Sequence, residues 1–443
     1  MAGEKPRGIG PQIWRRTPVM LKKAWSSRIA GFYRLTMEER LEAVRSFAGL
    51  TEEEAQAIVQ GAPPREKLDH LVENVIGTIG IPLGIATNFL INGKDYLVPM
   101  ATDESSVIAG ASNGARMARV KGGFKATSSE PLMAATIQIG ATKDAKRIQK
   151  IIHEKKEELL RLANTRSSTL PKMGAGAKDI QLHETNGFYG PLVIARLLVD
   201  VRDAMGANIV NTMAEFIAPQ IEKMTGETVY LKVIDNYAIE RTAKASCVVD
   251  PNALGGERVV DRFLQGYSCA YHDVHRACGH NKGVMNGVTA VVLATGNDTR
   301  AVESACHAYA TRSGTYRPLP VWGKNQDGDL IGELEIPVPV GIVGGLTKNH
   351  PAASACIKIL GVQSAREFGE VLASVGLASK LAAERALADE GIQRGHMSLH
   401  ATNVAMTVGA QGDEISRVAE AMIREKDISM KSAAEKLTAI RRG

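Results

Sequence analysis

The chain has 443 residues, a net charge of +6 and 23% charged residues, which exclude a long disordered or fibrous chain and favour two or three globular domains. The positive charge is not gathered into a basic block or a stripe interleaved with aromatic residues, so no nucleic-acid partner is expected. The 5 cysteines form no CxxC pair and no apolar run reaches the roughly 18 residues of a membrane span, so we expect a cytoplasmic protein with no disulfide framework, no metal site and no membrane partner.

The N-terminal segment, residues 1–26, is rich in proline, glycine and basic side chains. It predicts a disordered basic extension, with an organellar transit peptide as the alternative. Two capping-box signatures follow, in which a threonine and a glutamate satisfy backbone N–H groups at a helix start. Each precedes a glycine suited to end the helix: Thr36-x-x-Glu39 with Gly49, and Thr51-x-x-Glu54 with Gly61.

Short strands are predicted between Glu73 and Ala101, and Asn92-Gly93 is a strong hairpin signal. A helix is expected to start near Ser105–Ser106. The small residues from Ala109 to Ala115 give this helix a face that permits close approach, and we expect that face to lie at a contact between subunits.

Residues 130–235 read as a separate unit, because strand and helix patterns alternate there. A strand, a strongly amphipathic helix, a strand or buried helix, a helix and a final strand are predicted in turn: Ala134–Gly140, Lys143–Asn164, Leu192–Asp200, Ala207–Thr225 and Thr228–Ile234. Long helices dominate from Val248 to Ser379. Two more helical patterns, residues 413–425 and 429–441, follow Gly391.

Five clusters of polar residues and glycine interrupt the apolar pattern, and such interruptions are expected at functional sites. They are Thr102–Ser106, Asp203–Asn211, His275–Gly283, Ala294–Asp298 and Gly391–His400.

Each cluster has both a chemical and a structural interpretation. An acidic residue in the first cluster can be a general acid whose pKa is raised by burial, or a carboxylate that interacts favourably with the dipole of the following helix. Gly206 in the second lets backbone approach a phosphate at a helix start, or forms a tight turn. A buried Lys282 in the third can stabilise an oxyanion.

The last two clusters also have two interpretations each. Asp298 follows the apolar stretch Val288–Leu293, which suits a site residue at the end of a strand, or a helix N-cap. His396 and His400 share one helix face, but no further ligand is obvious. A proton donor or a structural histidine is therefore expected there in place of a metal.

The chain resembles the class II 3-hydroxy-3-methylglutaryl-coenzyme A (HMG-CoA) reductases. Seven strings carry the resemblance, in the family's order and near its spacing: Glu73-Asn-Val-Ile-Gly77, Asn88-Phe-x-Ile-Asn-Gly93, Asp203-Ala-Met-Gly-Ala-Asn208, His280-Asn-Lys-Gly283, Ala294-Thr-Gly-Asn-Asp298, Gly341-Ile-Val-Gly-Gly345 and Gly391-Ile-Gln-Arg-Gly-His-Met397.

The resemblance implies a mixed α/β (α+β) fold with three parts. A large, mainly helical substrate domain would comprise residues 27–129 and 236–390. A small split α/β cofactor domain, residues 130–235, would be inserted into it. Residues 391–443 would form a mobile C-terminal helical flap.

The resemblance also assigns roles to named residues. The catalytic set would be Glu104, Lys282, Asp298 and His396. The HMG group would meet Ser106, Asn236, Arg276 and Asn286, and Arg34 would meet a CoA phosphate. The nicotinamide cofactor would meet Asp203, Met205, Gly206, Asn208 and Asn211, with Arg166 and Ser167 near its adenosine ribose.

The implied activity is the reduction of HMG-CoA to mevalonate and CoA by two hydride transfers, in a homodimer or a trimer of dimers. Members that prefer NADH carry an aspartate where this chain has Ser167 beside Arg166. NADPH is therefore favoured, with NADH as the alternative. Two questions stay open on these residues: whether the protein makes or breaks down mevalonate, and whether it is instead an inactive CoA-binding protein on the same fold.

Overall fold

The computed structural model describes residues 26–140, 142–389 and 391–442, without the side chains of residues 392–399. Apart from Ser26, the extension expected at residues 1–26 lies outside these ranges. In chain order the elements are η1 (Phe32–Arg34), α1 (Met37–Ala48), α2 (Glu52–Gln60), α3 (Arg65–Leu68), β1 (Leu83–Ile91), β2 (Lys94–Ala101), α4 (Val107–Arg119), β3 (Phe124–Ser128), β4 (Leu132–Ile139), α5 (Ala145–Glu154), α6 (Lys156–Asn164), η2 (Pro171–Met173), β5 (Gly176–Gly187), β6 (Gly190–Asp200), α7 (Ala207–Thr225), β7 (Val229–Asp235), β8 (Thr242–Val249), α8 (Pro251–Leu254), α9 (Glu257–His272), α10 (Val274–Ala294), α11 (Thr299–Tyr309), β9 (Pro320–Lys324), β10 (Leu330–Pro337), α12 (Gly345–Asn349), α13 (Pro351–Leu360), α14 (Ala365–Ala388), α15 (Ile392–Thr407), α16 (Asp413–Glu425) and α17 (Met430–Arg442).

The helix starts predicted near the N-terminus are confirmed. Thr36 and Thr51 each form a complete capping box with the glutamate three residues later. Gly49 and Gly61 end the two helices in the left-handed conformation, with φ of 64° and 69°. Glycine adopts this conformation without the steric cost that a Cβ would bring.

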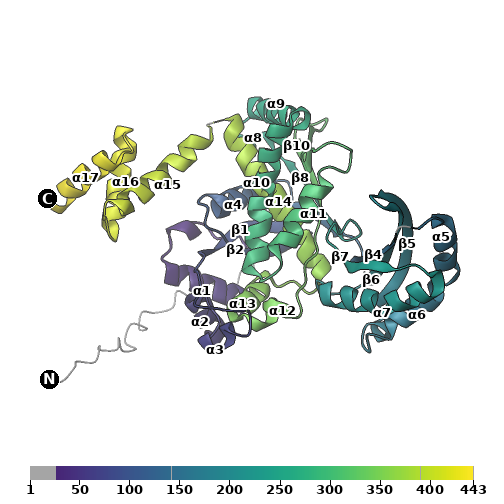
Figure 1. Cartoon of the computed structure of the whole chain (residues 1–443). Helices are drawn as coiled ribbons and strands as arrows, with labels where there is room; N and C mark the ends of the chain where they lie inside the picture. Colours follow the sequence, from purple (N-terminus) through teal and green to yellow (C-terminus); the bar gives the residue numbers. More distant parts are fainter. Residues whose placement is uncertain (1–25, 141, 390, 443) are drawn as a thin grey trace, which may run out of the picture.

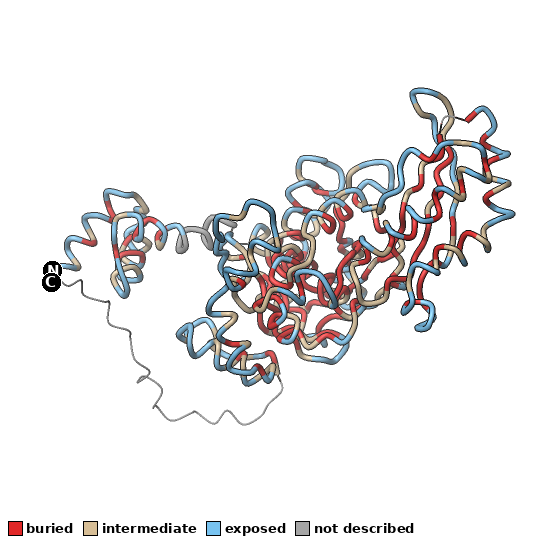
Figure 2. The backbone as a smooth tube through the Cα atoms, turned by 60° about the horizontal axis from the view of Figure 1, so that its bottom comes forward, coloured by how far each residue is buried: buried red, intermediate tan, exposed pale blue. Residues whose placement is uncertain are grey.

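A six-stranded sheet in the order β2-β1-β3-β8-β10-β9 forms the centre of the molecule (Figure 1). The predicted hairpin joins β1 to β2, with Asn92 and Gly93 at φ of 51° and 80°. Positive φ at both turn residues matches the right-handed twist of the strands. Buried residues concentrate around this sheet and the helices that cover it (Figure 2).

Helices α4, α10 and α14 pack against the six-stranded sheet and against one another. The small-residue face of α4 lies on α14 of the same chain. A Cβ at Gly114 would come 2.0 Å from the carbonyl oxygen of Ala378, and Ala111 and Ala115 are fully buried. The expectation that this face meets another subunit is therefore wrong, because close helix packing within the chain already uses it.

The chain leaves the six-stranded sheet after β3 and re-enters it as β8, although these two strands are paired neighbours. Between them lies a four-stranded antiparallel sheet, β5-β6-β4-β7, with its own hydrophobic core formed with α5, α6 and α7. Figure 1 shows this unit on the right of the molecule. The strand and helix patterns of residues 130–235 predict a small α/β unit here, and its insertion is what the resemblance implies.

The single helix predicted over Lys143–Asn164 is instead two helices that meet at Lys155, whose ψ of 7° leaves helical geometry. Ile152 and Leu159 are buried on either side of the break. They lie seven residues apart, about two helical turns, so the apolar periodicity stays in phase and does not reveal the break.

The last three helices, α15 to α17, extend from the body of the molecule (Figure 1) and share a separate hydrophobic cluster. The helix predicted over residues 413–425 is confirmed at both ends, and the following one is displaced by a single residue. Across the described part of the chain, no helix is both long and apolar enough to cross a membrane.

Candidate active site

Glu104, Lys282 and Asn286 meet where the sheet and α10 come together. Glu104 lies in the turn between β2 and α4, and Lys282 and Asn286 lie one turn apart on α10, which packs against β2. Lys282 Nζ donates a hydrogen bond to Glu104 Oε2, and Asn286 Nδ2 donates to Glu104 Oε1 over 3.3 Å. The structure thus joins two of the four predicted catalytic residues and one predicted substrate contact.

The turn that carries Glu104 is strained. Ser106, predicted to contact the substrate, has φ of 71° and precedes α4 without a side-chain cap. A serine in the left-handed region costs free energy, and such positions cluster at functional sites.

Lys282 and Glu104 are more exposed than the sequence reasoning assumed. Their side chains are 59% and 42% accessible in the single chain. A buried lysine was expected from the neighbouring apolar stretch, but that stretch faces inward while Lys282 lies on the outer side of the same helix. The pair is therefore open to a ligand.

Asp298 has a structural partner in addition to its predicted role. Its Oδ1 accepts from the backbone N–H groups of Arg300 and Ala301 at 2.9 and 3.1 Å, so it is the N-cap of α11. Within the described residues it has no hydrogen bond or ion pair to Glu104 or Lys282. The interpretation of Val288–Leu293 as a strand before it is wrong: these residues end the long helix α10, because a short buried apolar run does not distinguish strand from helix.

Two further predicted site residues, Asn236 and Arg34, have no hydrogen bond to this cluster within the described residues. Asn236 is exposed in the turn after β7 and has no hydrogen bond within the part of the chain that the structure describes. Arg34 is the exposed last residue of η1, and its Nε donates to the Tyr33 hydroxyl at 3.0 Å. His396 lies in α15, but its side chain is outside the described set.

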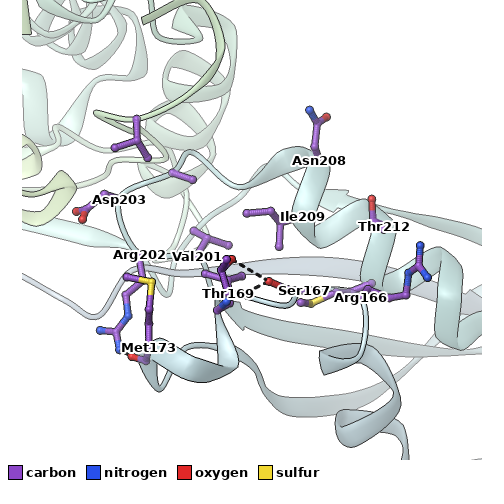
Figure 3. A pocket seen from close by; sticks show the side chains of 14 residues that line it. Arg166, Ser167, Thr169, Met173, Val201, Arg202, Asp203, Asn208, Ile209 and Thr212 are labelled. Atoms are coloured by element: carbon purple, nitrogen blue, oxygen red, sulfur yellow. Dashed lines mark hydrogen bonds between the residues drawn. The ribbon is translucent and has the colours of Figure 1, made fainter. Parts of the chain in front are cut away.

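A second candidate site is a cavity of about 470 Å³ in the inserted unit (Figure 3). It lies between the segment after α6 and the start of α7. Its lining includes four of the residues predicted to meet the cofactor: Arg166, Ser167, Asp203 and Asn208. Met205, Gly206 and Asn211 do not line it. The Asn211 side-chain oxygen instead accepts from the N–H of Ile234 at 2.7 Å.

The start of α7 suits a phosphate group. Gly206 has φ of 101° and provides no side-chain cap, so the first N–H groups of the helix are available to an anion. Across the cavity, the Arg166 guanidinium lies 4.7 Å from the centre of the Phe216 ring. Ser167 Oγ accepts from the N–H of Leu170 at 3.1 Å, so it also shapes its own loop.

Sequence reasoning missed Arg241, which supports the turn before α7. Its Nη1 donates to the carbonyls of Ala204 and Met205 at 2.9 and 3.2 Å, and its Nη2 donates to the carbonyl of Val340 at 2.5 Å. Burial lowers the pKa of Arg241 to about 10, against the opposing charges of Asp203 and Asp200. No local pattern marks this arginine, because its partners are backbone atoms far along the chain.

A family model described as hydroxymethylglutaryl-coenzyme A reductase matches residues 36–401. The chain belongs to the HMG-CoA reductase family. The matched region includes Glu104, Lys282, Asp298 and His396.

Two reductases of this family match most of the chain. The 3-hydroxy-3-methylglutaryl-coenzyme A reductase of Archaeoglobus fulgidus is 48% identical over 421 residues, which are 95% of this chain and 96% of that one. A probable reductase of Borreliella burgdorferi is 37% identical and covers 76% of this chain and 78% of its own.

The fold is also that of solved HMG-CoA reductases. The class II enzyme of Streptococcus pneumoniae, bound to NADPH in open conformations, matches with a TM-score of 0.77 and 34% identity over 92% of this chain and all of that chain. A second structure of that reductase matches with a TM-score of 0.79 and 33% identity, covering 93% of this chain and 99% of the other. The mixed α/β fold class and the class II resemblance are thereby confirmed.

Proposed function

We propose that the protein catalyses the reduction of HMG-CoA to mevalonate and free CoA, with NADPH as the reductant. The observation that carries this proposal is the exposed Lys282–Glu104 pair, which is hydrogen-bonded to Asn286 and lies in the same turn as the strained Ser106. A cation and a carboxyl group that are hydrogen-bonded to each other can both reach the oxygen of one bound carbonyl. They provide the oxyanion stabilisation and the proton that two successive carbonyl reductions require.

Each residue then has a distinct task. NADPH, when bound, supplies the hydride for each reduction. Lys282 stabilises the negative charge that develops on the thioester oxygen. Glu104 protonates the aldehyde oxygen in the second reduction. Asp298, at the start of α11, completes the proposed catalytic set.

The HMG group lies among Ser106, Asn236, Asn286 and Arg276 in this proposal. Arg276 faces its free carboxylate, since a guanidinium matches a carboxylate in shape and charge. Arg34 meets a phosphate of CoA. These side chains come from separate parts of the chain, so substrate binding draws them toward one another.

The cavity beside α7 is the proposed NADPH site. The open first turn of α7 suits a phosphate, as does the Arg166 guanidinium across the cavity. The absence of an acidic side chain at Ser167 removes the repulsion that disfavours a 2′-phosphate on the ribose. NADPH is therefore the proposed cofactor, and NADH the weaker alternative.

We assign residues 391–443 as a flap that delivers His396 to the departing CoA thiolate, which His396 protonates. The helices α15 to α17 share their own hydrophobic cluster and extend from the body, which supports a unit that moves as a whole. Residues 27–129 and 236–390 form the proposed substrate domain, and residues 130–235 the cofactor domain.

A homodimer, or a trimer of dimers, is the proposed assembly. The segment between α3 and β1 exposes four large apolar side chains in the single chain: Val72, Ile76, Ile79 and Ile81. A run of exposed apolar residues without helix or strand is stabilised when a partner covers it. This segment replaces the α4 face as the reason to expect a dimer.

Steady-state kinetics with HMG-CoA and either NADPH or NADH test the proposal. The reductase should oxidise NADPH only when HMG-CoA is present and should release free thiol. A well-folded protein that binds CoA but oxidises neither nucleotide would contradict the activity and favour an inactive CoA-binding protein.

A further inference from the structure

A group of charged side chains is buried under Arg276, between α9, α10 and α14. Lys380 and Glu384, one turn apart on α14, are 1% and 2% exposed, and His280 on α10 is fully buried. Arg276 reaches this group from α10, with 27% of its side chain exposed. The buried group is thus connected to the surface through Arg276.

One carboxylate oxygen holds the group together. Glu384 Oε2 accepts from Arg276 Nη2 at 2.8 Å and from Lys380 Nζ at 2.6 Å. His280 Nε2 lies 3.9 Å from the same oxygen. Burial and then the charges of Lys380 and Arg276 lower the pKa of His280, so this histidine is neutral and leaves Glu384 to the two cations.

Stability does not explain this arrangement. Replacing a buried ion pair by well-packed apolar residues is often neutral or stabilising, because the charges lose their hydration. The rest of this part of α14 is apolar and tightly packed, with Leu377, Ala378 and Leu381 fully buried. A charged pair in such a helix therefore points to a role outside the fold.

The neighbouring helix α9 leaves room for the carboxylate. A Cβ at Gly266 would lie 2.6 Å from Glu384 Oε1, closer than side chains tolerate. The Glu384 carboxylate is thereby confined on one side by α9 and on the other by its two cations.

We infer that Glu384, held by Lys380, is a positioning residue that orients the Arg276 guanidinium toward the free carboxylate of the substrate. The inference rests on the proposed function, in which Arg276 meets that carboxylate. Glu384 fixes one amino group of Arg276 and leaves the rest of the guanidinium to the substrate. Lys380 balances the charge of Glu384, so Arg276 keeps its net attraction for an anion.

This arrangement determines which kinetic constant should change. Within the described residues Glu384 has no hydrogen bond or ion pair to Glu104 or Lys282 and does not line the cofactor cavity. Its loss should therefore weaken substrate binding and leave the chemical step in place. Charge-assisted hydrogen bonds contribute enough that removing one should raise KM for HMG-CoA roughly 10-fold or more.

The test compares Glu384→Gln with the double variant Lys380→Met/Glu384→Met. Both should show the raised KM for HMG-CoA, with kcat and the KM for NADPH close to wild type. The double variant should unfold at a temperature no lower than wild type, which separates positioning from a structural role. Glu370→Gln is the matched control, because Glu370 lies on the same helix but contacts Asn92 and Ser128.

An unchanged KM for HMG-CoA in the stable double variant would overturn the inference while the proposed function stands. A raised KM for NADPH equal to that for HMG-CoA would also overturn it, since the effect would then be general. A wild-type protein without HMG-CoA-dependent turnover would overturn the proposed function and this inference together.

Discussion

Arg241 links the turn before α7 to the six-stranded sheet, and replacing it with methionine should damage cofactor binding. The side chain is 4% exposed and donates to the carbonyls of Ala204, Met205 and Val340. Methionine fills much of the same volume but donates nothing. The Val340 carbonyl is buried and those of Ala204 and Met205 are partly buried. Losing the donor costs about 1–3 kcal/mol at the first and about 1 kcal/mol at each of the other two, so Arg241→Met should lower the free energy of unfolding by roughly 3–5 kcal/mol in total.

The loss should also appear in function, because Asp203 lines the cavity and the turn that follows it begins α7. Isothermal titration should find NADPH binding weakened about tenfold or more, equivalent to ~1.4 kcal/mol. Thermal unfolding measures the stability of the same samples. The KM for HMG-CoA should change little.

Arg119→Met is the control. Arg119 is also a largely buried guanidinium, but it binds Asp95 at 2.7 Å in the large sheet region. The Arg119→Met variant should be less stable than the wild type but should bind NADPH with the same affinity. The reasoning would be refuted if Arg241→Met were destabilised but bound NADPH as tightly as the control does.

Four further predictions follow from the sites. Lys282→Ala should lose ~10²–10³ in kcat with the fold intact, because one oxyanion donor is gone; near-normal turnover by a folded variant would contradict its role. His396→Gln should still reduce free mevaldehyde while it turns over HMG-CoA poorly, and an equal fall in both rates would be inconsistent with thiolate protonation. Ser167→Asp should shift kcat/KM toward NADH, measured with both nucleotides. A wild type that already prefers NADH would contradict the proposed preference for NADPH. Burial lowers the pKa of Lys380 from 10.5 to about 8, so between these values the unfolded chain binds the proton that the folded one has released. The free energy of unfolding of the wild type, measured relative to Lys380→Met, should therefore rise as the pH increases from about 8 toward 10.5. A difference between the two proteins that stays constant across this pH range would exclude the shift.

Local signals in the sequence were enough for the elements whose ends they mark. The capping boxes at Thr36 and Thr51 fix two helix starts, and Asn92-Gly93 fixes a hairpin, because each acts through backbone groups within a few residues. The bounds of α7 were also predictable, since Gly206 and Gly226 border a strongly periodic run.

Features that depend on tertiary packing were not predictable in this way. The small face of α4 indicated close packing but not the identity of its partner, which is α14 of the same chain. The apolar run before Asp298 did not reveal a helix, because an apolar run this short fits a buried strand and a buried helix equally well. Lys380 and Glu384 were not singled out from the sequence. A charged pair at helical spacing in an apolar segment could have marked them, but their partner Arg276 lies about a hundred residues away.

The candidate site was predictable chiefly where residues lie at element junctions. Glu104 follows a strand and Lys282 belongs to a conspicuous cationic cluster, and the structure brings these two together. Arg34 and Asn236 were assigned from the resemblance alone, and within the described residues neither has a hydrogen bond to Glu104 or Lys282.

The stoichiometry of the reaction tests the central claim most directly. Purified protein is given limiting HMG-CoA and excess NADPH, and oxidised nucleotide is measured against the free CoA thiol released. The account predicts two NADPH oxidised for each CoA released, with mevalonate as the product. One NADPH per CoA with mevaldehyde accumulating, or CoA released without nucleotide oxidation, would contradict it.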